Sequence, residues 1–344
     1  MTYVDVLNEA WQQHLAPRAD DAPTVISLFA GCGGSSLGYS MAGYQELLAV
    51  EWGANAVETF RLNFPDVPVY HGDIAKLSVE ECLQMTGLQP GELDVLDGSP
   101  PCQGFSTAGK RILDDPRNDL FREYVRLLRG LRPRVFVMEN VSGMVKGKMK
   151  LVFAEIMREL KASGYQVSAR LMNAMYFNVP QSRQRMIFVG VRDDLGIAPS
   201  HPVAMNQPVT AGDAIGALAD DMTLRVVLAD DSKTANQMQH VRPGNRCKQH
   251  HSHHRLAVDK PSPTVDRGGG AGAYHIWHPK EHRPITVAEV RRICSFPDVF
   301  RFAGKVTDAF ERIGNSVPPL FMRAIAGHIR EHILTVQPLA MAAD

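Results

Sequence analysis

The clearest candidate for chemistry in this chain is Cys102, which follows two prolines in the run Pro100-Pro101-Cys102. The run comes directly after the strand-like segment LDVLDG at 93–98. A thiolate is strongly nucleophilic near neutral pH and is also a good leaving group, so it suits reversible covalent catalysis. A buried structural cysteine would need no such rigid presentation. We therefore expect Cys102 to be a covalent nucleophile.

One acid and two arginines have side chains that could act beside this thiol. Glu139 lies near the end of the apolar segment RVFVMEN (134–140), and a carboxylic acid enclosed in an active site can keep a proton and donate it. An acid at a strand end is otherwise usually a solvated cap or an ion-pair partner. In Gln181-x-Arg183-x-Arg185, the alternation of side chains along a strand predicts two guanidinium groups on one face. An isolated pair of this kind would by default face solvent.

A glycine-rich turn predicts a cofactor site. The segment TVISLF (24–29) runs into AGCGG (30–34), which opens a helix, and glycines let a cofactor approach the backbone closely. Glu51 ends the next strand-like segment, where an acid can accept hydrogen bonds from a ribose diol. Asp73 ends the third and offers a carboxylate to an adenine amino group. A glycine turn alone is a weak signal, but the absence of GxGxxG and the presence of Phe29 favour an adenosine–methionine ligand over a dinucleotide.

Six blocks along the chain carry a resemblance to a known family. They are the glycine turn of 29–34, PPCQGFS (100–106), ENV (139–141), QSRQR (181–185), RPITVAEVRRICSFP (283–297) and GNSVPP (314–319). In this order they resemble the cytosine-5 DNA methyltransferases, and they span most of the chain. The resemblance implies a DNA (cytosine-5-)-methyltransferase with S-adenosyl-L-methionine as cofactor and double-stranded DNA as substrate.

The implied reaction explains why these residue types are needed. Carbon 5 of cytosine is too electron-poor to attack a sulfonium methyl group, so a nucleophile such as the Cys102 thiolate must first add at carbon 6. The resemblance assigns Glu139 to ring nitrogen 3, Arg185 to the carbonyl oxygen of the base, and Arg183 to support of the site or to a phosphate. Because the target base lies inside a duplex, the nucleotide must rotate out of the stack.

The same resemblance assigns contacts to the cofactor and to DNA. The expected cofactor-binding residues are Phe29, Gly31, Cys32, Gly33, Gly34, Glu51, Trp52, Asp73, Ile74, Pro101, Leu120, Asn315 and Ser316. The expected DNA-binding residues are Gln103, Ser106, Lys110, Arg111, Arg246, Lys248 and Arg267. This chain departs from the family in carrying Ser27, two residues before Phe29, where an acid is often found. That departure lies at the cofactor end of the expected site.

Alternating strand-like and helix-like segments must position these groups. Strand patterns occur at 24–29, 47–52, 67–74, 93–98, 134–140, 165–173 and 185–191, and helix patterns at 34–42, 53–63, 118–130 and 149–163. The alternation predicts an α/β fold with a parallel, doubly wound sheet and helices on both faces. The resemblance implies the mixed sheet of an S-adenosylmethionine-dependent, Rossmann-like methyltransferase.

We expect three parts along the chain. Residues 1–22 form an N-terminal helix and extension with Val4, Leu7, Trp11 and Leu15 on one face, and 23–190 plus 310–336 form the catalytic, cofactor-binding domain. Residues 191–309 form a smaller, irregular target-recognition domain that reads DNA. Further helices are expected from Thr286 to Cys294 and from Pro318 to about Leu334. The apolar face of the last helix consists of Leu320, Ile325, Ile329 and Ile333.

Composition limits the kind of partner. Lys and Arg (37) balance Asp and Glu (37), so any nucleic-acid surface must be local. Residues 233–283 hold nine Lys or Arg against three acids, which fits either a solvated loop or phosphate contacts. Five scattered cysteines favour reduced thiols, and no apolar run approaches the roughly 18 residues of a membrane span. We expect a cytoplasmic monomer without membrane contact, and a companion restriction endonuclease is a partner that the resemblance allows.

Several alternatives stay open at this point. A tRNA cytosine-5 methyltransferase of the same fold would share the chemistry. A catalytically inactive DNA-binding relative would be expected to lack Cys102 or Glu139, yet both are present. An NAD enzyme is disfavoured by the glycine pattern. The run from Cys247 to His254 invites a zinc site, but one cysteine with clustered histidines lacks paired ligand spacing, so no metal is expected.

Overall fold

The structure, a computed structural model of the chain, does not describe every residue. It describes residues 1–101, 119–145, 149–204, 207–216, 218, 233–249, 253–266 and 275–335. The expected nucleophile Cys102 and the expected DNA contacts Gln103, Ser106, Lys110, Arg111 and Arg267 lie outside these ranges.

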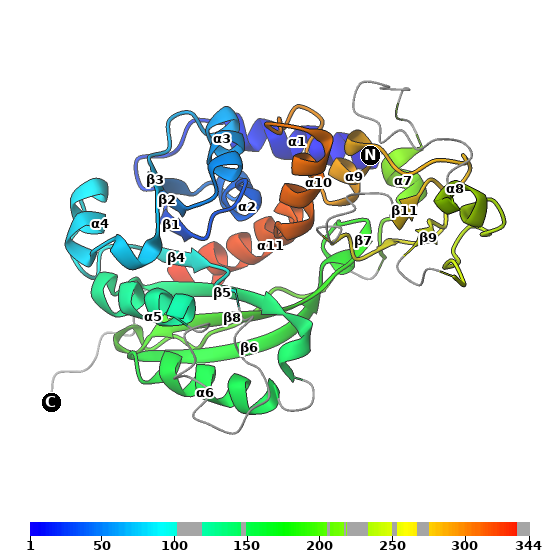
Figure 1. The fold of residues 1–344 in the computed structure, drawn as a ribbon. Coiled ribbons are helices and arrows are strands. Elements are labelled where there is room, and N and C mark those ends of the chain that lie inside the picture. Colours follow the sequence, from blue (N-terminus) through cyan, green and yellow to red (C-terminus); the bar gives the residue numbers. More distant parts are fainter. Residues whose placement is uncertain are drawn as a thin grey trace, which may run out of the picture.

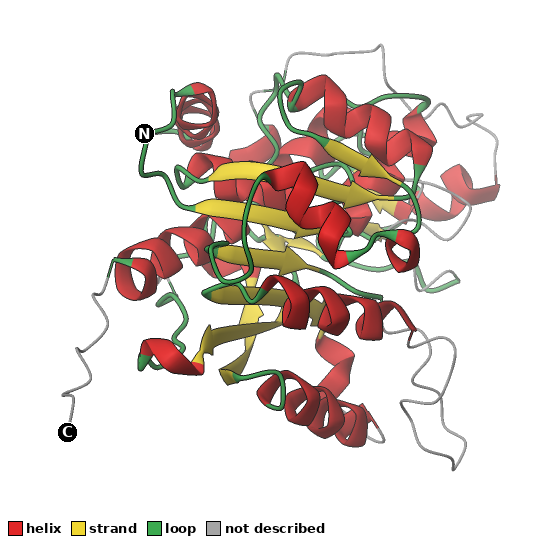
Figure 2. Ribbon diagram, turned by 90° about the vertical axis from the view of Figure 1, so that its left-hand side faces the viewer, coloured by secondary structure: helices red, strands yellow, loops and turns green. Residues whose placement is uncertain are grey.

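Seven strands form one mixed sheet at the centre of the protein (Figures 1 and 2). They are β1 (Thr24–Leu28), β2 (Gln45–Glu51), β3 (Val69–His71), β4 (Val95–Gly98), β5 (Val135–Val141), β6 (Tyr165–Asn173) and β8 (Gln184–Arg192). The strand order is β3-β2-β1-β4-β5-β8-β6. Neighbours from β3 to β5 run parallel, while β8 runs antiparallel to both β5 and β6. The α/β class with a mixed sheet is thus confirmed.

The reversed strand β8 corrects the wholly parallel sheet that the alternation of segments predicted. Between β6 and β8 the chain contains only η5 (Ala174–Tyr176) and β7 (Gln181–Ser182). A short connection can join antiparallel partners, whereas a parallel neighbour needs a longer crossover that is usually a helix. Hydrophobic period alone does not reveal strand direction. The signal for the reversal of β8 was the absence of a crossover helix between it and β6.

Helices cover both faces of the sheet, as expected (Figure 2). One hydrophobic cluster contains Val25 of β1 and Leu37 of α2, and a second contains Ile26 of β1 and Ile156 of α6. Successive residues of β1 therefore serve opposite cores, as the pleat requires. The helices of this part are α2 (Gly34–Met41), α3 (Ala54–Asn63), α4 (Val79–Thr86), α5 (Asp119–Leu131) and α6 (Met149–Lys161), with the short η1 (Ile74–Lys76) and η4 (Ser142–Val145).

The sequence pattern predicted the buried apolar face correctly for the last helix but only in part for the first. In α1 (Tyr3–Leu15) the buried residues are Tyr3, Leu7 and Ala10, while Leu15 is 58% exposed. The predicted face was therefore wrong at Leu15, the last residue of the helix, while Val4 and Trp11 are half-buried. In α11 (Pro319–Ile329) and the turn η9 (Arg330–Leu334), all four predicted apolar residues are buried.

The chain between β8 and α11 forms short elements. These are η6 (Asp193–Leu195), α7 (Ala211–Ile215), α8 (Lys233–Met238), β9 (His254–Arg255), β10 (Ser262–Pro263), β11 (Ile276–Trp277), α9 (Val287–Ile293) and α10 (Val306–Asn315). Strand β10 pairs with β7, and β11 pairs with β9. Within the described ranges, no helix is long and apolar enough to cross a membrane.

Arg255 connects several of these short elements. Its guanidinium group donates hydrogen bonds to the backbone carbonyls of Met238, Val241, His278 and Glu281. The neighbouring apolar cluster is small, with Ala235, Met238, Cys247 and Trp277 as its buried members. A buried arginine that satisfies backbone carbonyls of separate segments can therefore do part of the work that a larger apolar core would do.

The close packing of β5 against β8 gives a test of this fold. A Cβ on Gly190 would lie 1.9 Å from a ring carbon of Phe136, which is its partner in the register. We expect Gly190→Ala to lower the free energy of unfolding by about 1–3 kcal/mol, because the ring must leave its place. The matched control is Gly327→Ala on α11, where a Cβ would meet nothing within 4 Å. Denaturant unfolding should show the control to be neutral or stabilised by up to about 1 kcal/mol, and equal destabilisation of both variants would contradict this packing.

Candidate active site

The glycine turn after β1 is fixed mainly by packing. Gly33 and Gly34 leave no room for a side chain, since a Cβ would lie 2.4 Å from a Phe64 ring carbon in the first case and 2.4 Å from the Val317 carbonyl oxygen in the second. Gly31 differs, because its φ is +58° and no atom lies within 4 Å of the position of its Cβ. The turn is thus closed on one side and open at Gly31, and backbone can be approached there.

Glu51 holds the open side of this turn. One carboxylate oxygen accepts the Gly31 N–H at 2.9 Å and the other accepts the Gly53 N–H at 2.8 Å. A carboxylate has about four acceptor positions, so both oxygens can still accept further hydrogen bonds. The adjacent Trp52 is 80% exposed, which is unusual for so large an apolar side chain. Asp73 is also exposed, and one of its oxygens accepts the Ala75 N–H.

The segment after α10 returns to the glycine turn. The Ser316 hydroxyl lies 3.1 Å from the Cys32 thiol and donates to the Arg312 carbonyl at 2.7 Å. Burial raises the pKa of the Cys32 thiol to about 11, so the group stays protonated and unreactive at neutral pH. Asn315 is exposed beside this contact. The structure therefore brings together the turn and the 314–317 segment, which are far apart in the sequence.

The end of β5 holds the segment that leads to Cys102. The side-chain amide of the buried Asn140 donates to the Pro100 carbonyl at 3.1 Å. Pro101 is exposed, and Leu120 on α5 is half-buried against the second hydrophobic cluster. The importance of Asn140 was not foreseen from the sequence, although the run Glu139-Asn140-Val141 was the available signal.

Glu139 and Arg185 form an ion pair at this same edge of the sheet. The Nε of Arg185 lies 2.7 Å from a Glu139 oxygen, and the two side chains are 14% and 11% exposed. The pair joins the adjacent strands β5 and β8, where Glu139 stands opposite Ile187. Arg185 also donates to the Gln184 carbonyl. An acid and a cation are thus held together next to the residue that fixes Pro100.

Arg183 does not share a strand with Arg185, which corrects the sequence prediction. Strand β7 ends at Ser182 and β8 begins at Gln184, so Arg183 lies between the two strands and belongs to neither. The buried guanidinium group donates to the carbonyls of Val265 and Gly314, and burial lowers its pKa to about 10. The side chain of Arg183 is buried, so in this arrangement it is not accessible to a phosphate.

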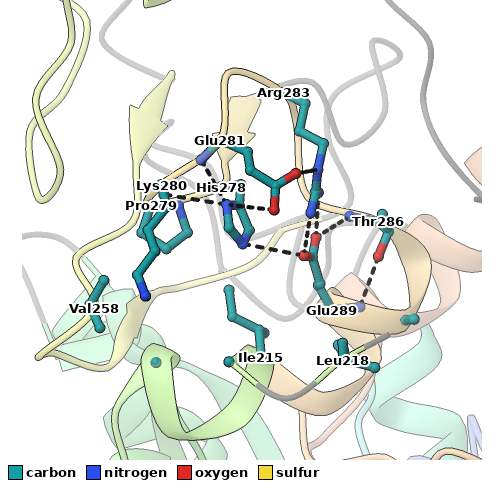
Figure 3. Close-up of a pocket in the computed structure, with 13 residues that line it drawn as sticks. Ile215, Leu218, Val258, His278, Pro279, Lys280, Glu281, Arg283, Thr286 and Glu289 are labelled. Atoms are coloured by element: carbon teal, nitrogen blue, oxygen red, sulfur yellow. Dashed lines mark hydrogen bonds and ion pairs between the residues drawn. The ribbon is translucent and has the colours of Figure 1, made fainter. Parts of the chain in front are cut away.

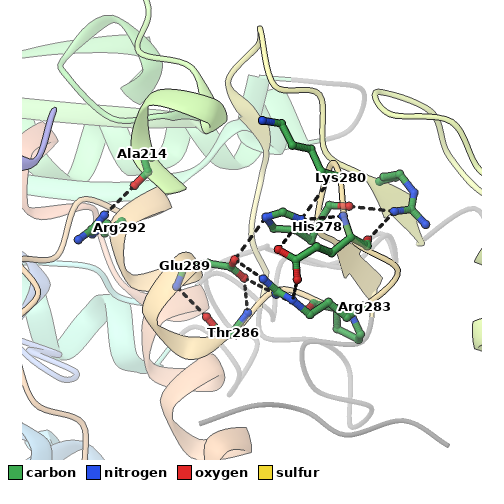
Figure 4. A network of polar contacts seen from close by, with 10 residues as sticks. Ala214, His278, Lys280, Arg283, Thr286, Glu289 and Arg292 are labelled. Atoms are coloured by element: carbon green, nitrogen blue, oxygen red, sulfur yellow. Dashed lines mark hydrogen bonds and ion pairs between the residues drawn. The ribbon is translucent and has the colours of Figure 1, made fainter. Parts of the chain in front are cut away.

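Some of the basic side chains in the stretch 233–283 are engaged in contacts within the protein. Arg246 and Lys248 are exposed, whereas Arg255 is buried. Arg283 makes two contacts of 2.9 and 2.8 Å with the buried Glu289 (Figure 4). The Cys247 thiol is buried and donates a hydrogen bond to Oε1 of Gln249. His250 and His251 lie outside the described residues. The local positive excess therefore overstates the charge that is available to DNA.

The network around Glu289 fixes α9 to the segment before it. Besides Arg283, the carboxylate accepts the Thr286 N–H at 2.7 Å and lies 3.6 Å from Nε2 of His278 (Figure 4). His278 accepts the Glu281 N–H through Nδ1, and burial lowers its pKa, which favours the neutral ring. The run RPITVAEVRRI is thus a scaffold within the described chain.

A pocket of about 200 Å³ lies beside this network (Figure 3). It is lined by residues of α7, by the 278–283 segment and by the start of α9. None of the residues expected to contact cofactor, cytosine or DNA lines it. Its arginine is already paired with Glu289, and none of its lining residues is a cysteine or a serine. The candidate active site therefore lies at the carboxyl edge of the sheet.

The Glu289 network can be tested against a surface pair. Glu289→Ala removes the buried carboxylate that binds Arg283, whose side chain is only 17% exposed, and leaves it paired only with the half-exposed Glu281. We expect a loss of about 3–5 kcal/mol in unfolding free energy, as for a broken buried ion pair. Glu155→Ala, which removes one of the two acidic partners of the 69% exposed Arg158, should cost about 0–1 kcal/mol. Urea unfolding of both variants measures the difference, and similar losses would show that the network is not the scaffold.

Comparison with known proteins gives one family over most of the chain. A family model described as C-5 cytosine-specific DNA methylase matches residues 23–331. The chain is 36% identical to the Type II methyltransferase M1.HphI of Haemophilus parahaemolyticus, over 88% of this chain and 85% of that protein. It is 33% identical to the Type II methyltransferase M.NgoPII of Neisseria gonorrhoeae, over 93% and 98% of the two chains.

A solved structure gives the same result for the fold. A DNA modification methyltransferase encoded within an E. coli prophage superposes with a TM-score of 0.76 at 26% identity. The superposition covers 91% of this chain and 100% of the other.

Proposed function

The chain belongs to the C-5 cytosine-specific DNA methylase family, and from this premise we propose that it works through a covalent adduct between Cys102 and carbon 6 of a flipped cytosine. Membership makes the protein a DNA cytosine methyltransferase that uses S-adenosylmethionine. The proposal concerns which residues carry out the reaction.

One observation carries the proposal: two consecutive residues of β5 reach two different parts of the site. Glu139 is paired with Arg185, and Asn140 binds the carbonyl of Pro100, two residues before Cys102. The acid, the arginine and the segment that leads to the thiol are therefore held by a single strand end. Such mutual positioning is what a nucleophile and its acid partner require.

The residues at the glycine turn fit an adenosine–methionine ligand. Open space at Gly31, an exposed aromatic ring at Trp52 and two carboxylates that retain acceptor capacity provide a surface for adenosine. We assign Glu51 to the ribose hydroxyls, Asp73 to the adenine amino group and Asn315 to the methionine part. When bound, the cofactor supplies an electrophilic methyl group. The Ser27 departure leaves these contact residues in place.

In the proposed mechanism the thiolate of Cys102 adds to carbon 6, and Glu139 holds a proton at ring nitrogen 3, so the ring becomes an enamine. Arg185 donates to the carbonyl oxygen of the base; its five N–H donors exceed its contacts with Glu139 and Gln184. After carbon 5 has gained the methyl group, loss of its proton and departure of the thiolate restore the aromatic ring.

We assign the DNA contacts to two separate parts of the chain. Residues 191–309 are the proposed DNA-reading part, and the exposed Arg246 and Lys248 would contact phosphates there. Gln103, Ser106, Lys110, Arg111 and Arg267 are further proposed contacts from the sequence. The names of the Type II relatives fit a companion restriction endonuclease, which we propose as a partner. From the sequence we further propose a cytoplasmic monomer.

Replacing the nucleophile tests the covalent step. Cys102→Ala should abolish methyl transfer from labelled S-adenosylmethionine to unmethylated duplex DNA and leave cofactor binding intact. Cys82→Ala, a buried thiol on α4, should keep activity. Bisulfite sequencing of the product locates the methylated cytosines. Turnover by Cys102→Ala would end the covalent proposal, while transfer to tRNA in place of DNA would redirect the substrate assignment.

Replacing the acid tests the role of Glu139. Glu139→Gln keeps the shape of the side chain but cannot supply a proton in the same way, so we expect the transfer rate to fall by about 10²–10⁴-fold. Single-turnover kinetics with saturating cofactor and DNA would measure this step. A rate within a factor of about three of the wild type would contradict the assignment.

A further inference from the structure

Two carboxyl groups are buried beneath α2, outside the contacts assigned above. Glu46 on β2 and Asp97 on β4 are 6% and 3% exposed. In the parallel register Glu46 lies opposite Val25 and Asp97 lies opposite Ser27, both on β1. Because Val25 and Ser27 lie on one face of β1, the two acids share that face. We call Glu46 and Asp97 the buried carboxyl pair.

The buried carboxyl pair accepts hydrogen bonds from α2, the helix that begins at the glycine turn. The Ser36 hydroxyl donates to Oε1 of Glu46 at 2.9 Å, and the Tyr39 hydroxyl donates to Oδ1 of Asp97 at 3.3 Å. Ser36 also lies 3.5 Å from the Ser27 hydroxyl. These contacts fasten the first turns of α2 to the two strands on either side of β1.

The surroundings of the buried carboxyl pair do not suit two negative charges. The titratable groups that act on the pair are its own two members, Glu139 on β5 and the phenols of Tyr39 and Tyr124. In the part of the chain that the structure describes, no cation is among them. Oε2 of Glu46 is buried without a hydrogen-bond partner there. An ionised carboxylate with such an oxygen is strongly unfavourable in an apolar interior, whereas a protonated one is much less so.

Burial acts on both groups in the direction that this geometry requires. It raises the pKa of Glu46 to about 7. Burial, followed by the charge on Glu46, raises the pKa of Asp97 to about 8. At neutral pH the pair therefore retains a proton that it would have lost in the unfolded chain.

We propose that Glu46 and Asp97 are positioning residues that retain a proton in the folded enzyme and thereby fix α2 and β4. The helix carries the glycine turn at its start, and β4 leads to Pro100 and Cys102. Loss of the proton puts two unneutralised charges under α2 and loosens both attachments. The part of this inference that concerns the glycine turn depends only on cofactor binding. The part that concerns β4 depends on the proposed role of Cys102.

The arrangement also accounts for Ser27, the departure noted in the sequence. An acid at position 27 would lie beside Asp97 in the register and would add a third carboxyl to a site without a cation. Serine at this position instead lies close to Ser36 without adding charge. The chain has thus placed its acids on β2 and β4, on either side of β1.

The sign of the pH effect follows from the raised pKa values. The native state binds more protons than the unfolded chain between roughly pH 4, the ordinary range of these acids, and the native values near 7 and 8. The stabilising contribution of the pair is therefore fully present below this window and is lost as pH rises through it. Asn and Gln cannot ionise, so Asp97→Asn with Glu46→Gln removes this fall.

The main experiment measures thermal unfolding and S-adenosylhomocysteine affinity from pH 5 to 9, because neither involves Cys102. The melting temperatures of the wild type and of the exposed control Glu58→Gln should fall as pH rises. Calorimetry should show that both bind S-adenosylhomocysteine about five- to tenfold more weakly at pH 9 than at pH 7. This is the expected size because one linked proton changes affinity at most about tenfold per pH unit. The double variant Glu46→Gln/Asp97→Asn should show a flatter profile in both measurements. Identical slopes for the double variant and the wild type would overturn the inference.

A second experiment adds an acid at position 27 and distinguishes repulsion among the buried carboxyl groups from a general loss of packing. Ser27→Asp should lower the melting temperature strongly in the wild type but much less in the Glu46→Gln/Asp97→Asn background, where only one acid is then present. Equal losses in the two backgrounds would refute the carboxyl pair as an interacting unit. Because both experiments omit DNA, their failure leaves the proposed function untouched, and inactivity of Cys102→Ala leaves this inference untouched.

Discussion

The parallel pairing of β1 with β2 and β4, and of β4 with β5, is the constraint on which the candidate site depends. Parallel neighbours end at the same edge of a sheet, so four separate stretches of chain deliver their next residues to one place. The glycine turn, Glu51, Pro100 and Glu139 lie along this edge for this reason. Local structure then refines the positions, through the contacts of Glu51 with the turn and of Asn140 with Pro100.

A second theme is the use of arginine as an internal connector. Arg183 joins the segment around Val265 to Gly314, Arg255 binds carbonyls of separate segments, and Arg283 holds Glu289. Around Arg255 the neighbouring apolar cluster is small. A planar group with five donors can satisfy several acceptors at once, so it stabilises an irregular part of a chain that regular hydrogen-bond ladders do not reach.

The sequence predicted the strands, the main helices and the groups at the strand ends, because hydrophobic period and strand-end motifs are local signals. The direction of β8, the interruption at Arg183 and the true face of α1 depend on packing partners that lie far away in the sequence. The same holds for the buried carboxyl pair, since neither Glu46 nor Asp97 stands in a pattern that marks it as buried. Exposed and internal arginines are also alike in the sequence, and only the structure shows that Arg255 and Arg283 are engaged within the protein.

The central claim, a covalent bond from Cys102 to carbon 6, is most directly tested by trapping that bond. In duplex DNA whose cytosines are replaced by 5-fluorocytosine, carbon 5 carries no proton to lose after methylation, so the thiolate cannot depart and the adduct should persist. Mass spectrometry of the digested enzyme should find the modified nucleotide on the peptide that contains Cys102, and only when S-adenosylmethionine is present. Methylated product without an adduct, or an adduct on another cysteine, would contradict the account.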